Sequence, residues 1–404
     1  MQNEGDTTFD AVKKFFQKPL KRAHFSGKKR ASSRGRAFRT RIMAVAMTMG
    51  ATFSPTLSAA FARQNAPDSG SDASSSVQTC VTASGEKLSY TIYDDWKSKH
   101  MQETVKKAID AVIATKTGES VLVPFIKQNG VFKLQSGMEG NTIGAYEAGS
   151  NCIMLNGGRI VAGRSGINYM KVAVVHEAAH AKQYRAGAKL DPNHNASTLF
   201  RLNRAMEADA RLHEVFVAGE LASKGDSSVW KMAERNEPQM LQSYNRSVKG
   251  GKSNTETALE TMMGYYKESS LQELYDRFYM RIVNCAASVN KENAATFAQD
   301  HLSNADIASK VCMLNGESYM TVRDSWDLSD TLCNSVSETT FARMVEISSQ
   351  HAEALKNAGV AAQVDDSHKF FYVRKQDGTY RSPEKSISAG TYKVASLAKE
   401  KGGR

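Results

Sequence analysis

The stretch KVAVVHEAAHAKQYRAG, residues 171–187, contains two histidines four positions apart, with a glutamate directly after the first. On a helix, residues four apart share one face and lie one turn from each other. His176 and His180 can therefore present two imidazole nitrogens to one metal ion, while Glu177 leans toward the same opening. This H-E-x-x-H pattern is typical of a zinc site in which the glutamate takes a proton from a metal-bound water.

The alternative is that two histidines share a buried helix by chance. Three specified positions, two of them a rare residue, recur by accident in about one chain in a hundred at ordinary residue frequencies. The side chains around the motif are apolar or small, which favours a packed metal-binding helix: Val172, Val174, Val175, Ala178, Ala179 and Ala181. The sequence therefore predicts a metal site on a helix over residues 167–186, which Gly187 ends.

A catalytic zinc takes a third protein ligand and keeps a fourth position open. In metzincins this ligand follows the second histidine closely, but the positions that would show that pattern hold Gln183 and Ala186. The other common source is a glutamate on a following helix, and Glu207 stands 27 residues after His180 in the helical pattern NRAMEADARLHE. The rivals for this role are His194 in the polar loop, Asp209 and His213.

H-E-A-A-H followed downstream by E-A-D-A resembles the gluzincin clan of zinc metallopeptidases. It is most similar to poorly characterised bacterial "putative metallopeptidase" families, whose first helix often reads H-E-x-x-H-A-x-Q, as it does here. The resemblance runs from about residue 142 to about residue 220. It implies a zincin-like fold, Zn²⁺ bound by His176, His180 and Glu207, Glu177 as the general base, and peptides or proteins as substrates.

One position departs from that family pattern. In many gluzincins an aspartate four residues after the ligand glutamate hydrogen-bonds a ligand histidine, but that position here is Arg211 and the nearby aspartate is Asp209. The hydrogen-bond partners of the histidines are therefore left open. So is the group that stabilises the oxyanion, for which the candidates are Tyr184, His194, Tyr265 and Tyr266.

The segments before the motif predict a small sheet accompanied by helices. They are a strand at 87–96, an amphipathic helix at 99–118 ended by Gly118, a strand, turn and strand at 120–137, and a hairpin at 142–155 with its turn at 148–151. The hairpin arms are residues 142–146 and 152–155. Given the resemblance, one arm is expected to be an edge strand that lies over the metal helix and pairs with an extended substrate.

The pattern after the motif helix is mainly helical. It predicts helices at about 198–223, 228–249, 255–284, 290–313 and 337–358, then a hairpin at 369–381 and a strand at 390–397. The fold class is therefore α+β. We expect a zincin-like metallopeptidase domain over residues 80–289, and a mainly helical C-terminal extension over 290–404 that covers the site or limits access to it.

The first 62 residues read as a basic leader with a signal-like segment. Residues 1–41 hold twelve Lys and Arg against three acidic residues, and the apolar residues 42–62 end in an A-x-A motif at Ala62. This order predicts export to the periplasm or the outside of the cell after cleavage near Ala62. The alternatives are an organelle presequence and a membrane tether at 42–62. Residues 63–79, rich in Ser, Asp and Gly, read as a disordered linker.

The distribution of charge limits the class of partner. The leader carries +9 of the net charge of +11, so residues 63–404 carry only +2, and a basic face for nucleic acid is not expected there. The five cysteines form no C-x-x-C pair, which argues against a cysteine zinc knuckle. Two function classes remain. One is a zinc metallopeptidase with membrane contact at most through its leader, and the other is a non-catalytic zincin-like metal-binding scaffold.

Overall fold

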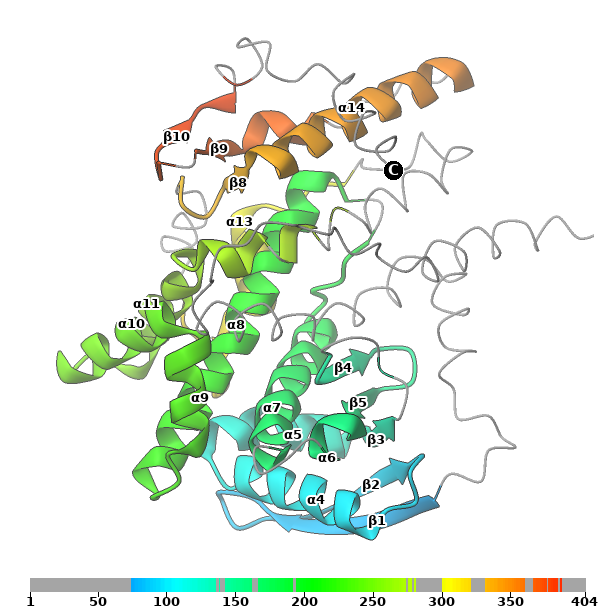
Figure 1. Ribbon diagram of the computed structural model, residues 1–404, viewed down its shortest axis with the longest axis vertical. Coiled ribbons are helices and arrows are strands. Elements are labelled where there is room, and N and C mark those ends of the chain that lie inside the picture. Colours follow the sequence, from blue (N-terminus) through cyan, green and yellow to red (C-terminus); the bar gives the residue numbers. More distant parts are fainter. Residues whose placement is uncertain are drawn as a thin grey trace, which may run out of the picture.

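The structure is a computed structural model (Figure 1). It describes residues 74–135, 138, 142–161, 166–191, 194–273, 275–277, 280, 300–320, 331–359, 366–375, 377–383 and 386. In this part of the chain a five-stranded sheet with its helices comes first, and a helical region with small sheets follows, so the predicted α+β class is confirmed. The predicted leader at 1–62, its cleavage site and Cys285 lie outside the described residues.

A mixed sheet opens the described chain. Its strands are β1 (Ser74–Val81), β2 (Lys87–Asp94), β3 (Val131–Gln135), β4 (Gly144–Glu147) and β5 (Cys152–Asn156), in the order β1-β2-β3-β5-β4. The three inner strands are parallel, and the edge strands β1 and β4 are antiparallel to their neighbours. Because β1 begins at Ser74, folded structure starts earlier than the predicted boundary at residue 80, and the linker prediction is wrong for residues 74–79.

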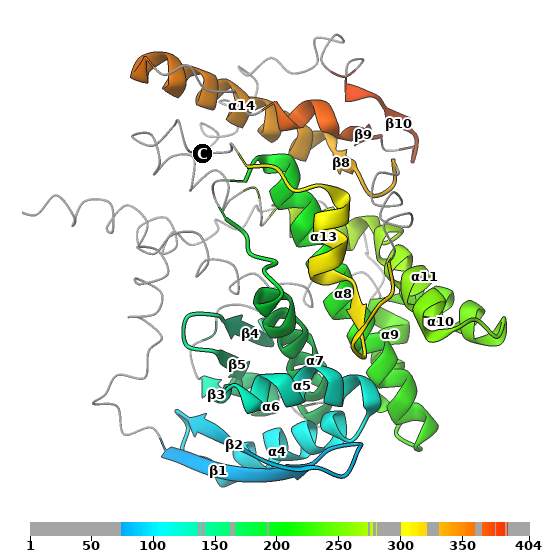
Figure 2. The same ribbon diagram turned by 180° about the vertical axis from the view of Figure 1, so that it is seen from behind.

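Helices of the same region pack against this sheet (Figures 1 and 2). They are α4 (Lys99–Ile113), α5 (Lys116–Lys127), α6 (Gly157–Val161) and α7 (Gly166–Arg185). The Ser98 side chain caps α4 by accepting from the Met101 amide at 3.4 Å. Helix α4 ends at Ile113, earlier than the predicted stop at Gly118. Helix α7 carries the H-E-x-x-H motif and agrees closely with its predicted range.

The strand predicted for the first half of residues 120–137 is wrong, because these residues belong to helix α5. The Thr115 hydroxyl caps this helix by accepting from the Gly118 amide at 3.0 Å. The apolar run that suggested a strand also has helical spacing, and its buried side chains are Val121, Leu122, Phe125 and Ile126. A Cβ at Gly118 would lie 2.0 Å from the Val112 carbonyl oxygen, so glycine permits the tight turn between α4 and α5.

The predicted hairpin at 142–155 is confirmed. Strands β4 and β5 pair antiparallel, from Gly144 opposite Leu155 to Glu147 opposite Cys152. The Asn156 side chain holds the residues that precede β4, because its Nδ2 donates to the Thr142 carbonyl at 2.6 Å. Strand β4 forms the end of the sheet and packs on the motif helix α7.

A long central helix, α8 (Ala196–Ser223), follows α7 and is buried along most of its length. The Asn195 side chain caps it by accepting from the Thr198 amide at 2.9 Å. The helices around it are α9 (Ser228–Asn236), α10 (Pro238–Lys249), α11 (Asn254–Tyr266), α13 (Asn304–Val311) and α14 (Glu338–Ala358). The helix predicted at 228–249 is divided at Pro238, which lacks an N–H to continue α9.

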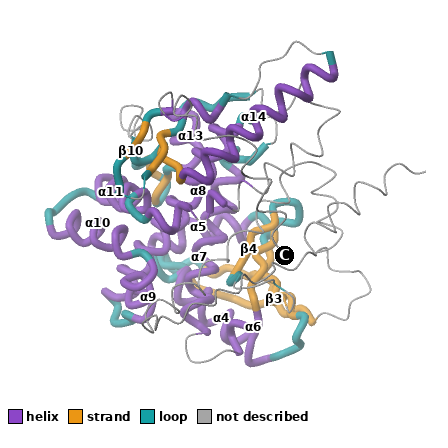
Figure 3. Tube along the Cα trace, turned by 45° about the horizontal axis from the view of Figure 1, so that its top comes forward, coloured by secondary structure: helices purple, strands orange, loops and turns teal. Residues whose placement is uncertain are grey.

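The predicted mainly helical extension contains strands as well as helices. A two-stranded sheet consists of β6 (Met313–Leu314) and β7 (Glu317–Ser318), and a three-stranded sheet contains β8 (Ser335–Ser337), β9 (Tyr372–Arg374) and β10 (Tyr380–Arg381). A 3₁₀ turn, Ser367–Phe370, precedes β9. The predicted hairpin at 369–381 is confirmed in β9 and β10. Figure 3 shows these small sheets apart from the five-stranded sheet, with helices between them.

The buried apolar side chains of the described residues form two large cores. One lies between the five-stranded sheet and α4, α5 and α7, and the other surrounds α8, α11, α13 and the C-terminal sheets. The second core runs from Ala188 to Val373, so the elements after residue 300 share their core with α8. None of the described helices is both long and apolar enough to span a membrane.

Candidate metal centre

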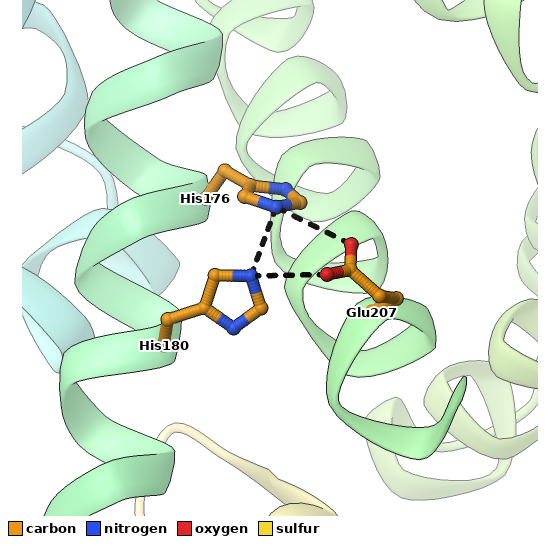
Figure 4. Close-up of side chains that lie close together, drawn as sticks. All are labelled: His176, His180 and Glu207. Carbon is orange, nitrogen blue, oxygen red and sulfur yellow. Dashed lines mark hydrogen bonds and ion pairs between the residues drawn. The ribbon is translucent and has the colours of Figure 1, made fainter. Parts of the chain in front are cut away.

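The motif helix α7 and the central helix α8 place three candidate ligands together (Figure 4). The Nε2 atoms of His176 and His180 are 3.0 Å apart, and each lies 3.6 Å from one carboxylate oxygen of Glu207. All three side chains are buried. Among the described residues they are the cluster of His, Cys, Asp and Glu side chains that could hold a metal ion. The structure therefore brings Glu207 to the two histidines, as predicted.

Hydrogen bonds on the far side of each ring determine which nitrogen faces the cluster. His176 Nδ1 lies 2.6 Å from a Glu214 carboxylate oxygen, and His180 Nδ1 lies 2.8 Å from the Gln183 side-chain oxygen. The ionised Glu214 carboxylate and the Gln183 side-chain oxygen are both acceptors, so each Nδ1 carries the proton. Each Nε2 is then unprotonated, and its lone pair points into the cluster.

The cluster fits a zinc ion. Zinc–nitrogen bonds of about 2.0–2.1 Å in tetrahedral geometry space the ligands by about 3.3 Å, and the observed separations of 3.0 and 3.6 Å lie on either side of that value. Two facing lone pairs repel each other without a cation between them. Both Glu207 oxygens are buried and have no hydrogen-bond partner within the described chain. Two imidazoles and a carboxylate are also a common donor set for zinc.

Burial sets the protonation of these groups when no metal is bound. It lowers the pKa of His180 to about 3 and the pKa of His176 well below its usual value, so both rings are neutral near pH 7. Burial raises the pKa of Glu207 to about 8, although the Arg211 guanidinium acts in the opposite direction. The pocket therefore disfavours charge until a cation enters it.

Glu177 lies between the motif helix and strand β4. A Cβ placed on Gly144 of β4 would lie 3.1 Å from Glu177 Cγ and 3.3 Å from its Oε1. The other oxygen, Oε2, is buried and has no hydrogen-bond partner in the part of the chain that the structure describes. Burial, and then the Glu207 carboxyl, raise the pKa of Glu177 well above its usual value. The Glu177 carboxyl is thus buried between α7 and β4, in surroundings that favour its protonated form.

The partner of His176 is a residue that the sequence did not single out. Glu214 stands seven residues after Glu207, two helical turns along the same face of α8, and this spacing was the available signal. Arg211, at the position where gluzincins often have an aspartate, lies 3.6 Å from Glu214 and also pairs with Glu237. It donates to the Tyr275 hydroxyl at 3.0 Å. The departure from the family pattern is therefore accompanied by a different set of contacts.

The other candidate residues have separate environments. The backbone of His194 forms an isolated β-bridge with Asp300, and the residue lies outside the cluster. This rival ligand is therefore not brought to the histidines. The ring of Tyr184 packs edge-on against Tyr146. Burial raises the pKa of Tyr265 well above its usual range and the nearby Glu207 raises it further. The remaining candidates are placed as follows: Tyr266 in the core around α8, His213 beside Lys182, and Asp209 against Gln183.

Comparison with protein families now adds an independent finding. Residues 91–321, more than half of the chain, match the sequence family described as "Putative metallopeptidase family (DUF6782)". The chain belongs to this family. The matched range begins within β2, runs through β7 and includes all three residues of the cluster, which is consistent with an H-E-x-x-H…E zinc site. The comparison with curated proteins and the comparison with solved structures gave no match.

Proposed function

We propose that this metallopeptidase family member is a zinc-dependent peptidase of the gluzincin type, with His176, His180 and Glu207 as ligands. The observation that supports the proposal most strongly is the convergence of two bare imidazole nitrogens and an unpartnered carboxylate in one buried cluster, next to Glu177. A purely structural metal site has no need of a buried carboxyl group beside its ligands, one of whose oxygens, Glu177 Oε2, has no hydrogen-bond partner among the described residues. Zinc is proposed because the N, N, O donor set suits it.

Glu177 is proposed as the general base. Zinc bound at the cluster would lower the pKa of a coordinated water to about 7 and polarise the scissile carbonyl. Glu177 takes the proton from the attacking water and delivers it to the nitrogen of the leaving amine. Burial, and then the Glu207 carboxyl, raise the pKa of Glu177, and a raised pKa makes its carboxylate a stronger proton acceptor.

Strand β4 is proposed as the substrate-binding edge of a zincin-like domain. It is the last strand of the sheet, it runs antiparallel to β5, and it packs on α7 beside Glu177. An extended peptide that adds to such an edge obtains affinity from main-chain hydrogen bonds, with little demand on its sequence. A peptide on β4 would lie beside the base and the ligands.

Metal content tests the ligand assignment. The full chain is loaded with zinc, and bound metal is measured beside Glu207→Ala and a matched control, Glu220→Ala. Glu220 lies on the same helix α8 but binds Thr117 at 2.5 Å, away from the cluster. We expect one zinc per chain in the parent and the control, with binding sharply weakened in Glu207→Ala. A parent that takes up no zinc under metal-replete conditions would refute the proposal.

Turnover separates the peptidase from the non-catalytic scaffold. Glu177→Gln keeps the size of the side chain but removes the proton acceptor. We expect it to keep zinc and to lose peptide hydrolysis by about a hundredfold to ten-thousandfold, measured with an unfolded protein such as casein. If the parent hydrolyses nothing and Glu177→Gln changes nothing, the scaffold alternative holds.

Export of the protein is also a proposal. It is supported by the order of the basic residues 1–41, the apolar residues 42–62 and the A-x-A end at Ala62. N-terminal sequencing of the mature chain tests it. A first residue at Arg63 is expected, and an intact leader in the exported fraction would contradict cleavage near Ala62.

A further inference from the structure

A chain of buried hydrogen bonds leads from His180 to residues 312–320, which follow α13. The Gln183 side-chain oxygen accepts from His180 Nδ1 at 2.8 Å, and Gln183 Nε2 donates to Asp209 Oδ2 at 2.7 Å. The hydroxyl of Tyr319 donates to the other oxygen, Asp209 Oδ1, at 2.9 Å. None of the four side chains is more than 3% exposed. Water therefore does not compete for these hydrogen bonds. We call this chain, His180–Gln183–Asp209–Tyr319, the relay.

The donor and acceptor of each hydrogen bond in the relay are fixed by the orientation of the Gln183 amide. Gln183 Nε2 faces two acceptors, the Asp209 carboxylate and the Met206 carbonyl at 2.9 Å. The amide must therefore turn its oxygen toward His180. That oxygen requires a proton on His180 Nδ1, which leaves Nε2 free as a metal ligand. A reversed amide would favour the opposite tautomer and remove the ligand lone pair.

Tyr319 is held firmly at the outer end of the relay. Its backbone amide donates to the Cys312 carbonyl at 3.1 Å, across the β6–β7 sheet. Lys182, on the motif helix, donates to the Met313 carbonyl in the same segment. Tyr319 belongs to the core around α8, and its hydroxyl also lies 3.3 Å from Met262 Sδ. The segment is thus attached both to α7 and to α8.

We propose that Tyr319 is a positioning residue of the metal centre, which acts through Asp209 and Gln183 to present His180 Nε2 to the ion. The inference rests on the proposed ligand role of His180. It gives residues 312–320 a direct part in assembling the site, in addition to the covering role expected of the C-terminal extension. The segment lies inside the family match, which ends at residue 321.

Zinc affinity of the full chain, measured by competition with a chelator, tests this role. Tyr319→Phe removes only the hydroxyl, and we expect binding to weaken about tenfold, the lower end of the effect of outer contacts on metal ligands. Gln183→Met removes the acceptor of His180 and is expected to weaken binding about tenfold to a hundredfold. The matched control is Tyr90→Phe, because the Tyr90 hydroxyl is buried in the other core without a hydrogen-bond partner among the described residues. Its affinity should equal that of the parent.

A double-mutant cycle distinguishes positioning from a general loss of structure. If Tyr319 acts through Gln183, Tyr319→Phe has no further effect on zinc affinity in a Gln183→Met background. Equal losses in both backgrounds would overturn the relay and leave Tyr319 as a packing residue. Zinc binding by the parent with unchanged affinity in Tyr319→Phe would also overturn the relay, while a parent that binds no zinc would overturn the metal site itself.

A measurement on the parent keeps the proposal testable if Tyr319→Phe does not fold. ¹⁵N-histidine NMR of the metal-free protein near pH 7 reports which ring nitrogen of His180 carries the proton, with the signal assigned by its loss in His180→Gln. The relay requires the proton on Nδ1. A proton on Nε2 would overturn it.

Discussion

At the scale of single residues, the candidate site is a set of polar groups whose burial suppresses charge. His176 and His180 are neutral rings, and Glu207 keeps a proton up to about pH 8 because burial raises its pKa. Each histidine directs its Nε2 toward the cluster, while its Nδ1 is hydrogen-bonded on the far side of the ring by Glu214 or Gln183. Burying these ligands away from water costs free energy in the metal-free state. Binding of a cation offsets that cost.

We predict that zinc binding releases one proton, so that the logarithm of the zinc affinity rises by one for each pH unit. The folded pKa of Glu207, about 8, lies above its ordinary value of 4.5, so the metal-free folded state holds a proton that the unfolded state has lost over this range. This contribution to stability is therefore lost as pH rises from about 4.5 to about 8. Zinc must displace the same proton, so affinity should rise about tenfold per pH unit until about pH 8. A steeper slope would show that a second group, such as Glu177, also releases a proton when zinc binds.

Glu214 is predicted to hold His176 in its ligand orientation. Glu214→Leu removes the acceptor of His176 Nδ1 at 2.6 Å, and we expect zinc affinity to fall about tenfold to a hundredfold. Glu214→Gln is the matched control, since its side-chain oxygen can still accept that proton. Calorimetric titration with zinc measures both. Parental affinity in Glu214→Leu would show that packing alone orients the ring.

At the scale of elements, the site depends on the contact between strand β4 and helix α7. Gly144 faces Ala173 and Glu177, and a Cβ there would lie 3.1 Å from both side chains. The absence of a side chain at this position lets the edge strand lie close to the proposed base. Glycine is used here for close approach and not for a special backbone angle.

Gly144→Ala is predicted to displace Glu177 by a few tenths of an ångström and to reduce peptide hydrolysis about tenfold, since small misplacements of reacting groups are costly. Zinc content should stay at the parental level, because the ligands lie on α7 and α8. Gly149→Ala is the control, because a Cβ at this position in the adjoining turn meets nothing within 4 Å. Equal activity of both variants would contradict the close-approach argument.

At the scale of the whole molecule, one buried arginine joins the central helix to the segment that contains Asp276 and to the C-terminal elements. Arg204 on α8 binds both oxygens of Asp276, at 2.9 and 2.5 Å, and donates to the carbonyl groups of Cys333 and Ser335. Its side chain is fully buried. The same helix contributes Glu207, so the C-terminal elements and the proposed site share one support.

Asp276→Ala is predicted to lower the free energy of unfolding by about 3–5 kcal/mol, because it leaves the Arg204 guanidinium buried without its counter-ion. The neighbouring Arg277→Ala is the control. It removes an exposed pair with Glu273, for which about 0–1 kcal/mol is expected. Chemical denaturation monitored by circular dichroism measures both. A loss in Asp276→Ala no larger than in the control would contradict the role of the buried pair.

Local sequence patterns determined much of the sheet and helix order and the residues of the candidate site. The H-E-x-x-H spacing specified a helix with two ligands on one face, and the alternation and turn residues at 142–155 specified the hairpin. The helical pattern around Glu207 was sufficient to bring forward the third candidate ligand. These features depend on neighbours within one or two turns of the chain, and local periodicity records such neighbours directly.

Tertiary structure decided what depends on distant contacts. The apolar run at 121–126 suits a strand or a helix, and packing against α4 and α7 selects the helix. Glu214 and Tyr319 lie 38 and 139 residues from the histidines whose orientation they are proposed to govern, and no local pattern relates them. The sequence by itself therefore determined which residues form the candidate metal site. The tertiary structure decided which residues hold them there, because a buried hydrogen bond requires partners that only the folded chain brings within about 3 Å.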